Sequence, residues 1–126
     1  MATAAFGRGS SEKSAAIASS PRSRSAPAIA QRGAFIQFDT IQGDPEYDTQ
    51  QRIEYVKGLI AAGFEDRVLL SQDVCLRSNL AALGGCGYTY VITGFRERLL
   101  DAGLSTELVT RFLVDNPRRA LTGAAA

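Results

Sequence analysis

Two short apolar runs, each ending in a carboxylate, constrain the fold of this chain more than any other feature. The first spans residues 34–39 and ends in Asp39, and the second spans residues 68–73 and ends in Asp73. Nearly continuous apolar runs of this length are typical of β-strands buried on both faces. We therefore expect two buried strands whose carboxyl ends both carry an acidic side chain.

The segment between these runs predicts an amphipathic helix. Asp48 or Thr49 can cap its first turn, and Gly63 follows it as a stop signal. The positions expected on the core side are Ile53, Val56, Leu59 and Ile60, and those expected on the solvent side are Arg52, Glu54 and Lys57. Two buried strands joined by such a helix form a βαβ unit, which implies an α/β fold with a parallel sheet covered by helices.

A long connection, residues 74–94, follows the second strand and contains the glycine cluster of residues 84–87. Long connections without regular structure are usually functional, and this one leaves the carboxyl end of a strand, where α/β proteins place their sites. The glycines do not form a phosphate-binding loop, because no Gly-Lys-Ser or Gly-Lys-Thr follows them. The alternative to a functional role is that these glycines simply form a flexible turn.

Two helices and a short turn are expected after this connection. The first helix covers residues 95–102 and is ended by Gly103, and the second begins at Ser105 or Thr106 and continues to about Val114. Pro117 opens the final turn. The core candidates here are Leu99, Leu100, Leu108, Val109, Phe112 and Leu113.

Residues 1–33 form a leader rich in Ser, Ala and Arg. Such a composition buries too little apolar surface to offset the entropy of ordering, so we expect the leader to be disordered and the folded domain to cover residues 34–122. The leader also has the composition of a transit peptide, without a secretory h-region, and an incorrectly assigned start of the chain is a further interpretation.

Composition excludes several classes of protein. The net charge is only +1 and the basic residues are not clustered, so no nucleic-acid partner is expected. No apolar stretch reaches the eighteen or so residues needed to cross a membrane. Cys75 and Cys86 have neither zinc-finger nor CxxC spacing, which favours reduced thiols in a soluble, cytoplasmic protein.

Three stretches of the sequence resemble the end of the phosphotriesterase family. They are residues 32–41, residues 66–75, and residues 84–88 taken together with 113–119. The resemblance covers roughly residues 32–122. It implies the C-terminal part of a (β/α)8 TIM barrel, namely strands seven and eight with the closing helices, preceded by the disordered leader.

By this resemblance the complete fold is a hydrolase of lactones, carboxylic esters or phosphotriesters that acts through a zinc-activated hydroxide. Asp73 takes the place of the family's catalytic aspartate, which ligates one ion of a binuclear centre of zinc or another divalent metal and accepts a proton. From the residues alone, Asp73 could equally cap the backbone of its own loop. Asp39 is expected to be a structural acceptor, since Thr40 stands where some relatives carry a proton-relay His or Arg.

The loop after Asp73 shapes the substrate pocket in this family. The resemblance therefore makes Cys75, Leu76, Arg77 and Tyr88 candidates for lining a pocket that binds a small ester-like substrate.

The other metal ligands of the family are several histidines and a bridging carboxylated lysine, whereas this chain contains no histidine. Lys13 and Lys57 fall in the leader and on the helix between the strands, away from a bridging position. We therefore expect no tight metal site and no activity in this chain alone, with an N-terminal barrel fragment as the implied partner. The alternative is a non-catalytic α/β binding or structural module that uses the loop of residues 74–94.

Overall fold

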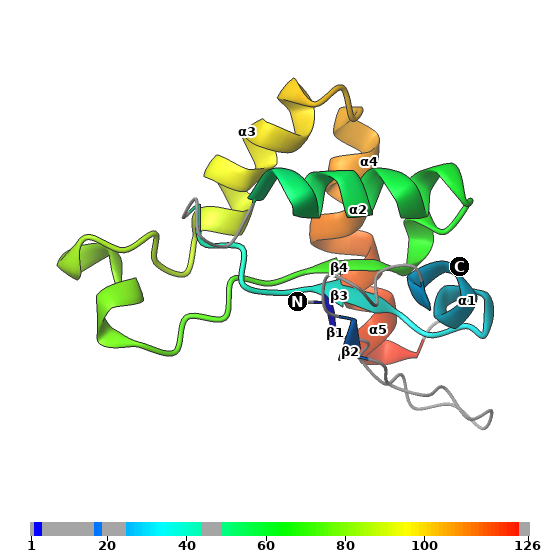
Figure 1. The fold of residues 1–126 in the computed structure, drawn as a ribbon, viewed down its shortest axis with the longest axis horizontal. Helices are drawn as coiled ribbons and strands as arrows, with labels where there is room; N and C mark the ends of the chain where they lie inside the picture. Colours follow the sequence, from blue (N-terminus) through cyan, green and yellow to red (C-terminus); the bar gives the residue numbers. More distant parts are fainter. Residues whose placement is uncertain (1, 4–16, 19–24, 44–48, 124–126) are drawn as a thin grey trace.

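The computed structural model describes residues 2–3, 17–18, 25–43 and 49–123. The fold is mixed α/β, as predicted (Figure 1). Its strands are β1 (Ala2–Thr3), β2 (Ile17–Ala18), β3 (Ile36–Phe38) and β4 (Val68–Leu70), and its α-helices are α1 (Ala26–Gln31), α2 (Thr49–Ala61), α3 (Gly94–Asp101), α4 (Thr106–Thr110) and α5 (Asn116–Thr122). Short 3-10 turns are η3 (Glu65–Arg67), η4 (Arg77–Asn79), η5 (Ala81–Leu83) and η6 (Tyr90–Ile92), and η7 (Arg111–Asp115) is a π-helical turn.

The strands form one sheet in the order β2-β1-β3-β4. β3 and β4 are parallel, with Ile36 opposite Val68, and α2 connects them, which confirms the predicted βαβ unit. β1 pairs antiparallel with the other edge of β3, so that Ala2 lies opposite Phe38. The parallel pair is therefore the part of the sheet that corresponds to the two carboxylate-ended runs.

Both parallel strands end earlier than the sequence suggested. Thr40 and Asp73 have positive φ angles of 61° and 51°, which take the backbone out of the extended region. Pairing continues briefly past the strands, since the Ser71 amide donates to the Phe38 carbonyl at 2.9 Å and the Ile41 amide donates to the Ser71 carbonyl at 3.1 Å. The acidic residues therefore lie in turns just beyond the strands.

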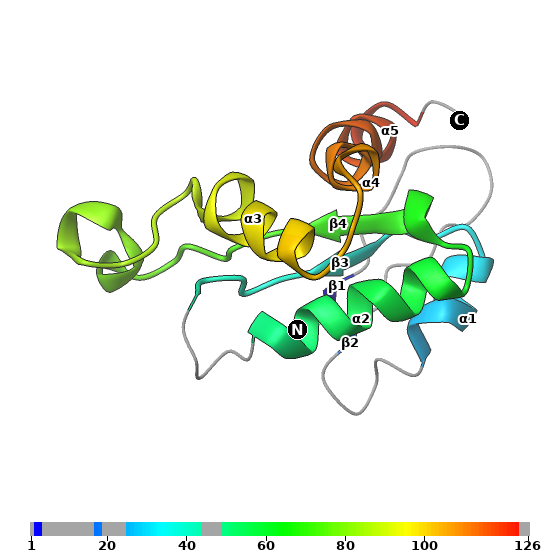
Figure 2. The same cartoon turned by 90° about the horizontal axis from the view of Figure 1, so that it is seen from above.

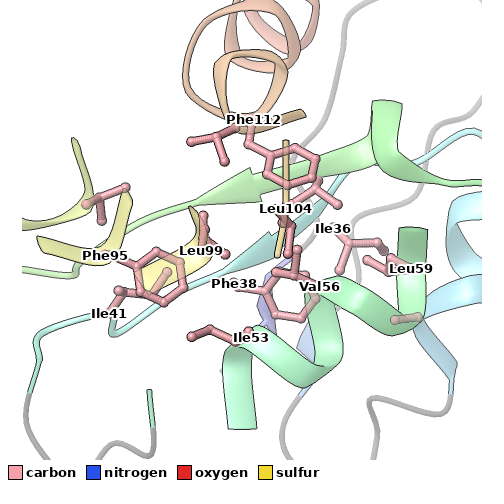
Figure 3. Close-up of a cluster of buried hydrophobic side chains, with 14 of the residues drawn as sticks. Ile36, Phe38, Ile41, Ile53, Val56, Leu59, Phe95, Leu99, Leu104 and Phe112 are labelled. Carbon is pink, nitrogen blue, oxygen red and sulfur yellow. The ribbon is translucent and has the colours of Figure 1, made fainter. Parts of the chain in front are cut away.

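Helices cover both faces of the sheet, with α1 and α2 on one side and α5 on the other (Figure 2). The larger core lies on the α2 side, where the side chains of Ile53, Val56 and Leu59 point toward Ile36 and Phe38 (Figure 3). The smaller cluster consists of Phe35, Leu69 and Ala120. Phe35, just before β3, and Ile36, its first residue, thus face different cores, as expected for an extended segment covered on both sides.

Helix α2 confirms the predicted apolar face and the stop at Gly63, whose φ is 78°. Glu54 and Lys57 are exposed, as expected. The expectation for Arg52 was wrong, because its side chain is buried and its Nε donates to the Asp39 carbonyl at 2.8 Å. A guanidinium that finds an acceptor while its methylene stem covers apolar surface can be buried in this way.

Most of residues 1–33, for which disorder was predicted, lie outside the described residues. Within this segment α1 is helical, with Pro27 in its first turn, and it buries Ala26 and Ala30 in the larger core. The Arg67 guanidinium donates to the Gly33 carbonyl at 3.2 Å and ties the end of this segment to the start of β4. Small side chains let α1 approach the core closely, so ordered structure begins before residue 34.

The C-terminal helices form a nearly continuous run from Thr106 to Thr122, rather than a helix followed by a short turn. The π-helical turn η7 lies just before Pro117. Proline has no backbone N–H, so it cannot donate the hydrogen bond that an ordinary residue makes within an α-helix. All six core candidates belong to the larger core or contact it. In the described part of the chain, no helix has the length and apolar character required to span a bilayer.

Candidate functional site

The carboxyl ends of β3 and β4 meet at one edge of the sheet, because the two strands are parallel. Asp39 is turned into its own loop, since its Oδ1 accepts a hydrogen bond of 2.8 Å from the Thr40 amide. Its carbonyl accepts the bond from Arg52 described above. Asp39 thus has the contacts of a structural acceptor.

Asp73 differs from Asp39 in that its side chain is exposed and its carboxylate accepts no hydrogen bond from any described residue. Its backbone has the left-handed φ of 51°, a conformation that costs a non-glycine residue about 1 kcal/mol. The described residues therefore offer no support for a carboxylate that caps its own loop. They leave both carboxylate oxygens available to a ligand.

Gln42 is a site residue that sequence reasoning missed. It is 7% exposed, and its Nε2 donates to the carbonyls of Gln72 and Asp73 at 2.9 and 3.0 Å. Its Oε1 accepts from Asn79 Nδ2 at 3.0 Å, and its own carbonyl accepts from Cys86 Sγ. The only signal in the sequence was a polar residue three positions after the run of residues 34–39, which is too common to identify such a role.

The loop of residues 74–94 contains the three single turns η4, η5 and η6, and it projects away from the sheet (Figure 1). Asn79 organises its first part, because Asn79 Oδ1 accepts from the Leu76 amide at 2.9 Å and the Asn79 carbonyl accepts from the Gly87 amide at 2.8 Å. Gln72 Nε2 donates to the Tyr88 carbonyl and brings the second part back toward the strand end. The loop is therefore anchored at several points.

The glycine cluster forms a turn with a defined shape. A Cβ at Gly85 would lie 2.3 Å from the carbonyl carbon and oxygen of Asn79, which only a shift of the backbone could relieve. Gly84 and Gly87 have φ angles of 89° and 69°, which favour glycine. The glycines thus permit a close approach between two segments of the loop.

The four candidate pocket residues, Cys75, Leu76, Arg77 and Tyr88, are all exposed. Leu76 and Tyr88 have exposed fractions of 62% and 68%, so neither is enclosed by the described residues. A cavity of about 420 Å³ between α2 and α3 is lined by residues that include Lys57 and Arg98, and it does not contain Asp73. None of the four candidate residues lines this cavity.

The donor set around Asp73 does not fit a zinc ion. Zinc sites use three or four protein ligands, mostly nitrogen and sulfur. Within the described ranges no group of three or more His, Cys, Asp or Glu side chains could hold a metal, and the whole chain has no histidine. Lys57 is exposed on α2, and Lys13 lies outside the described residues. Asp73 can thus offer one carboxylate ligand but no complete site.

A parallel βαβ unit carries polar residues and a long loop at the carboxyl ends of its strands, which is where α/β proteins place their functional sites. The sequence profile of the phosphotriesterase family matches residues 23–121, so this chain belongs to the phosphotriesterase family. The predicted resemblance is confirmed, and it begins earlier than residue 32 because it includes α1.

Several relatives are known. The chain is 41% identical over 85 residues to the phosphotriesterase homology protein of Escherichia coli, covering 68% of this chain and 29% of that protein. A crystal structure of that protein, complexed with phosphate in its active site, superimposes with a TM-score of 0.74 at 35% identity and covers 79% of this chain and 34% of that chain.

Two further relatives carry enzyme names. An N-acetyltaurine hydrolase of Bos taurus is 29% identical over 104 residues, which is 75% of this chain and 30% of that protein. A lactonase from Listeria monocytogenes superimposes with a TM-score of 0.73 at 31% identity, covering 82% of this chain and 33% of the lactonase. The chain thus spans about a third of the length of the relatives that it matches.

Proposed function

We propose that this chain forms strands seven and eight and the closing helices of a (β/α)8 barrel hydrolase that cleaves ester or amide bonds of small molecules. Membership of the phosphotriesterase family supports the hydrolase class. A lactonase and an N-acetyltaurine hydrolase among the relatives support an acyl substrate, either ester or amide. In this assignment β3 is strand seven and β4 is strand eight.

The observation that carries the proposal is the position of Asp73. It follows strand β4 at the carboxyl end of the parallel pair, which is the face where barrel enzymes hold their catalytic groups. Its carboxylate is exposed and accepts no hydrogen bond from a described residue. We propose that Asp73 supplies one carboxylate ligand to a divalent metal centre.

The remaining ligands of such a centre come, in this proposal, from residues outside this sequence. The absence of histidine and the isolation of Asp73 among the described residues support this division. A polypeptide that carries the first six strands of a barrel is the partner that we propose. Because the residues present do not fit the metal, we assign no hydrolytic step to this chain by itself.

The free thiols of Cys75 and Cys86 support a reducing, cytoplasmic setting.

The test compares the purified chain with a reconstituted barrel. We expect the chain alone to bind less than stoichiometric zinc and to turn over no lactone, aryl ester, aryl phosphotriester or N-acyl amide. Co-expression with the first six strands of the Escherichia coli phosphotriesterase homology protein is expected to give a complex that binds zinc and hydrolyses one of these substrates.

The reconstituted complex allows a matched pair of variants. Asp73→Asn removes a strand-end carboxylate and is expected to lower turnover at least about a hundredfold. Asp101→Asn changes an exposed carboxylate at the end of α3 and is expected to leave turnover unchanged. Zinc-dependent turnover by the chain alone, or equal activity of the two variants, would contradict the proposal.

One observation favours a second function, a non-catalytic binding module. Four large apolar side chains of the loop are more than half exposed, namely Leu76, Leu83, Tyr88 and Ile92. Exposed apolar groups of this kind are typical of interaction surfaces. This function predicts that a binding partner is retained by the zinc-free chain and lost on substitution of Leu83 and Ile92 by Ser, with no hydrolysis in any complex.

A further inference from the structure

We infer that Gln42 is the positioning residue of this site, since one buried amide fixes both the backbone of Asp73 and the loop of residues 74–94. The inference deepens the proposed function, on which it rests for the catalytic importance of Asp73. The contacts themselves involve only described residues. Gln42 follows β3, whereas its contacts follow β4, so the amide joins the ends of two strands that lie side by side.

The hydrogen-bonding capacity of the Gln42 amide matches its surroundings. A primary amide has two N–H donors and a carbonyl acceptor. Here the two donors are directed to the carbonyls of Gln72 and Asp73 at 2.9 and 3.0 Å, and the acceptor receives Asn79 Nδ2 at 3.0 Å. With the side chain buried, water does not compete for these groups. Substitution by an apolar residue therefore leaves all three of these part-buried partners without their bond to position 42.

The bonds from Gln42 explain how Asp73 keeps a left-handed backbone. A non-glycine residue at a φ of 51° persists only where its surroundings compensate for the strain. The amide holds the carbonyls on both sides of the φ and ψ bonds of Asp73, because the Gln72 carbonyl precedes them and the Asp73 carbonyl follows them. Rotation at Asp73 would break one or both bonds. The direction of the carboxylate is thereby linked to Gln42.

The same side chain anchors the loop. Asn79 donates to Gln42 Oε1 and also accepts from the amides of Leu76 and Gly87. Cys86 donates its thiol hydrogen to the Gln42 carbonyl, which brings the glycine turn to the same point. Loss of the Gln42 hydrogen bonds would therefore loosen the loop and, at the same time, free the backbone of Asp73 to rotate.

The test uses the full 126-residue chain and two substitutions of Gln42. Gln42→Met keeps the size and removes every side-chain hydrogen bond. Gln42→Glu replaces the donor with a carboxylate that faces two carbonyl oxygens. Because burial and these oxygens disfavour the charged form, its pKa lies above the usual value of roughly 4, and protonation at acid pH returns one O–H donor. Gln31→Met is the matched control, since Gln31 is an exposed glutamine on α1.

The readouts are hydrogen exchange at the Gly87 and Leu76 amides and the HN–Hα coupling constant of Asp73 measured by nuclear magnetic resonance. We expect Gln42→Met to lower protection of both amides about fivefold, the loss expected when roughly one net hydrogen bond is removed. The HN–Hα coupling constant of Asp73 is expected to change, because its φ angle leaves the left-handed region. At neutral pH Gln42→Glu keeps an acceptor for Asn79 Nδ2 but loses both donors, so the Asp73 coupling is expected to change; at acid pH it recovers in part, which a purely steric role would not produce. Gln31→Met changes nothing.

The Ser71 amide, which donates to the Phe38 carbonyl, reports whether the strands remain paired. If Gln42→Met also loses protection at Ser71, the strands themselves have separated in that variant. The acid recovery of Gln42→Glu then tests whether Gln42 positions Asp73. As a second variant, Asn79→Ala is expected to deprotect Leu76 and Gly87 while the Asp73 coupling stays native, because Gln42 still holds the strand end.

An unchanged Asp73 coupling in Gln42→Met, or no acid recovery in Gln42→Glu, would overturn the inference. These readouts need no metal and no turnover. Failure of the proposed hydrolase function, seen as a reconstituted complex without Asp73-dependent activity, is therefore distinguishable from failure of the positioning role of Gln42.

Discussion

Asn116 provides the sharpest test of how the C-terminal helices are fixed to the sheet. Its side chain is fully buried, and its Nδ2 donates to the Val68 carbonyl at 2.7 Å and to the Glu65 carbonyl at 2.9 Å. Its Oδ1 accepts from the Arg119 guanidinium at 2.5 Å. One amide thus connects α5 to the turn and strand that precede the candidate site.

Replacement of Asn116 by alanine removes all three bonds and leaves their partners in place. A buried polar group without a partner costs about 1–3 kcal/mol. The Val68 carbonyl bears most of this cost, because its bond to Asn116 is buried, whereas Glu65 and Arg119 are partly exposed. We expect a total loss of about 3 kcal/mol, which for a domain of this size lowers the melting temperature by roughly 12–24 °C.

Thermal and urea unfolding of the wild type, Asn116→Ala and Arg118→Ala, followed by circular dichroism, measures this loss. Arg118 lies on the same helix and makes an exposed ion pair of 3.8 Å with Asp115, so its substitution is expected to cost less than about 0.5 kcal/mol. Equal stability of the two variants would refute the reasoning that buried amide contacts fix α5 to β4.

Three further predictions concern other parts of the chain. Gly85→Ala is expected to shift the backbone near Asn79 and to make residues 74–94 more sensitive to limited proteolysis, without a change in the core. Phe112→Ala, at a side chain 1% exposed, is expected to cost about 3–5 kcal/mol, seen as a lower urea midpoint. The pKa of Glu107 is lowered from 4.5 because its carboxylate accepts a backbone hydrogen bond and one from Ser105. Since the folded pKa lies below the unfolded one, the stabilisation from Glu107 is present above pH 4.5 and is lost as the pH falls through the folded value. An NMR titration in which Ser105→Ala left this pKa unchanged would be inconsistent with the assigned cause.

Much of the βαβ unit could be predicted from the sequence because its signals are local. The apolar positions of α2 recur with the helical period, and Gly63 marks its end. The ends of the strands could not be predicted, since they depend on Thr40 and Asp73 leaving the extended conformation. Arg52 was assigned to solvent from the same periodicity, which does not register an acceptor supplied by a different segment.

The candidate site could likewise be predicted only in part from the sequence. Asp73 was identifiable from its place at the end of an apolar run and from the family resemblance, and its role as a metal ligand stays a prediction. Gln42 was not identifiable, because its three side-chain bonds reach residues 30 to 37 positions away. The loop of residues 74–94 was recognised by its length, but its anchoring through Asn79 depends on where the chain returns.

The sequence by itself determined the α/β class, the order of the two parallel strands and their helix, and membership of the phosphotriesterase family. These follow from periodicity, turn residues and motif, which act over a few neighbouring positions. Tertiary structure decided which polar side chains are buried and what they hold. Gln42, Arg52 and Asn116 each satisfy carbonyl groups on another segment, and a buried hydrogen bond between distant segments exists only once the chain has folded.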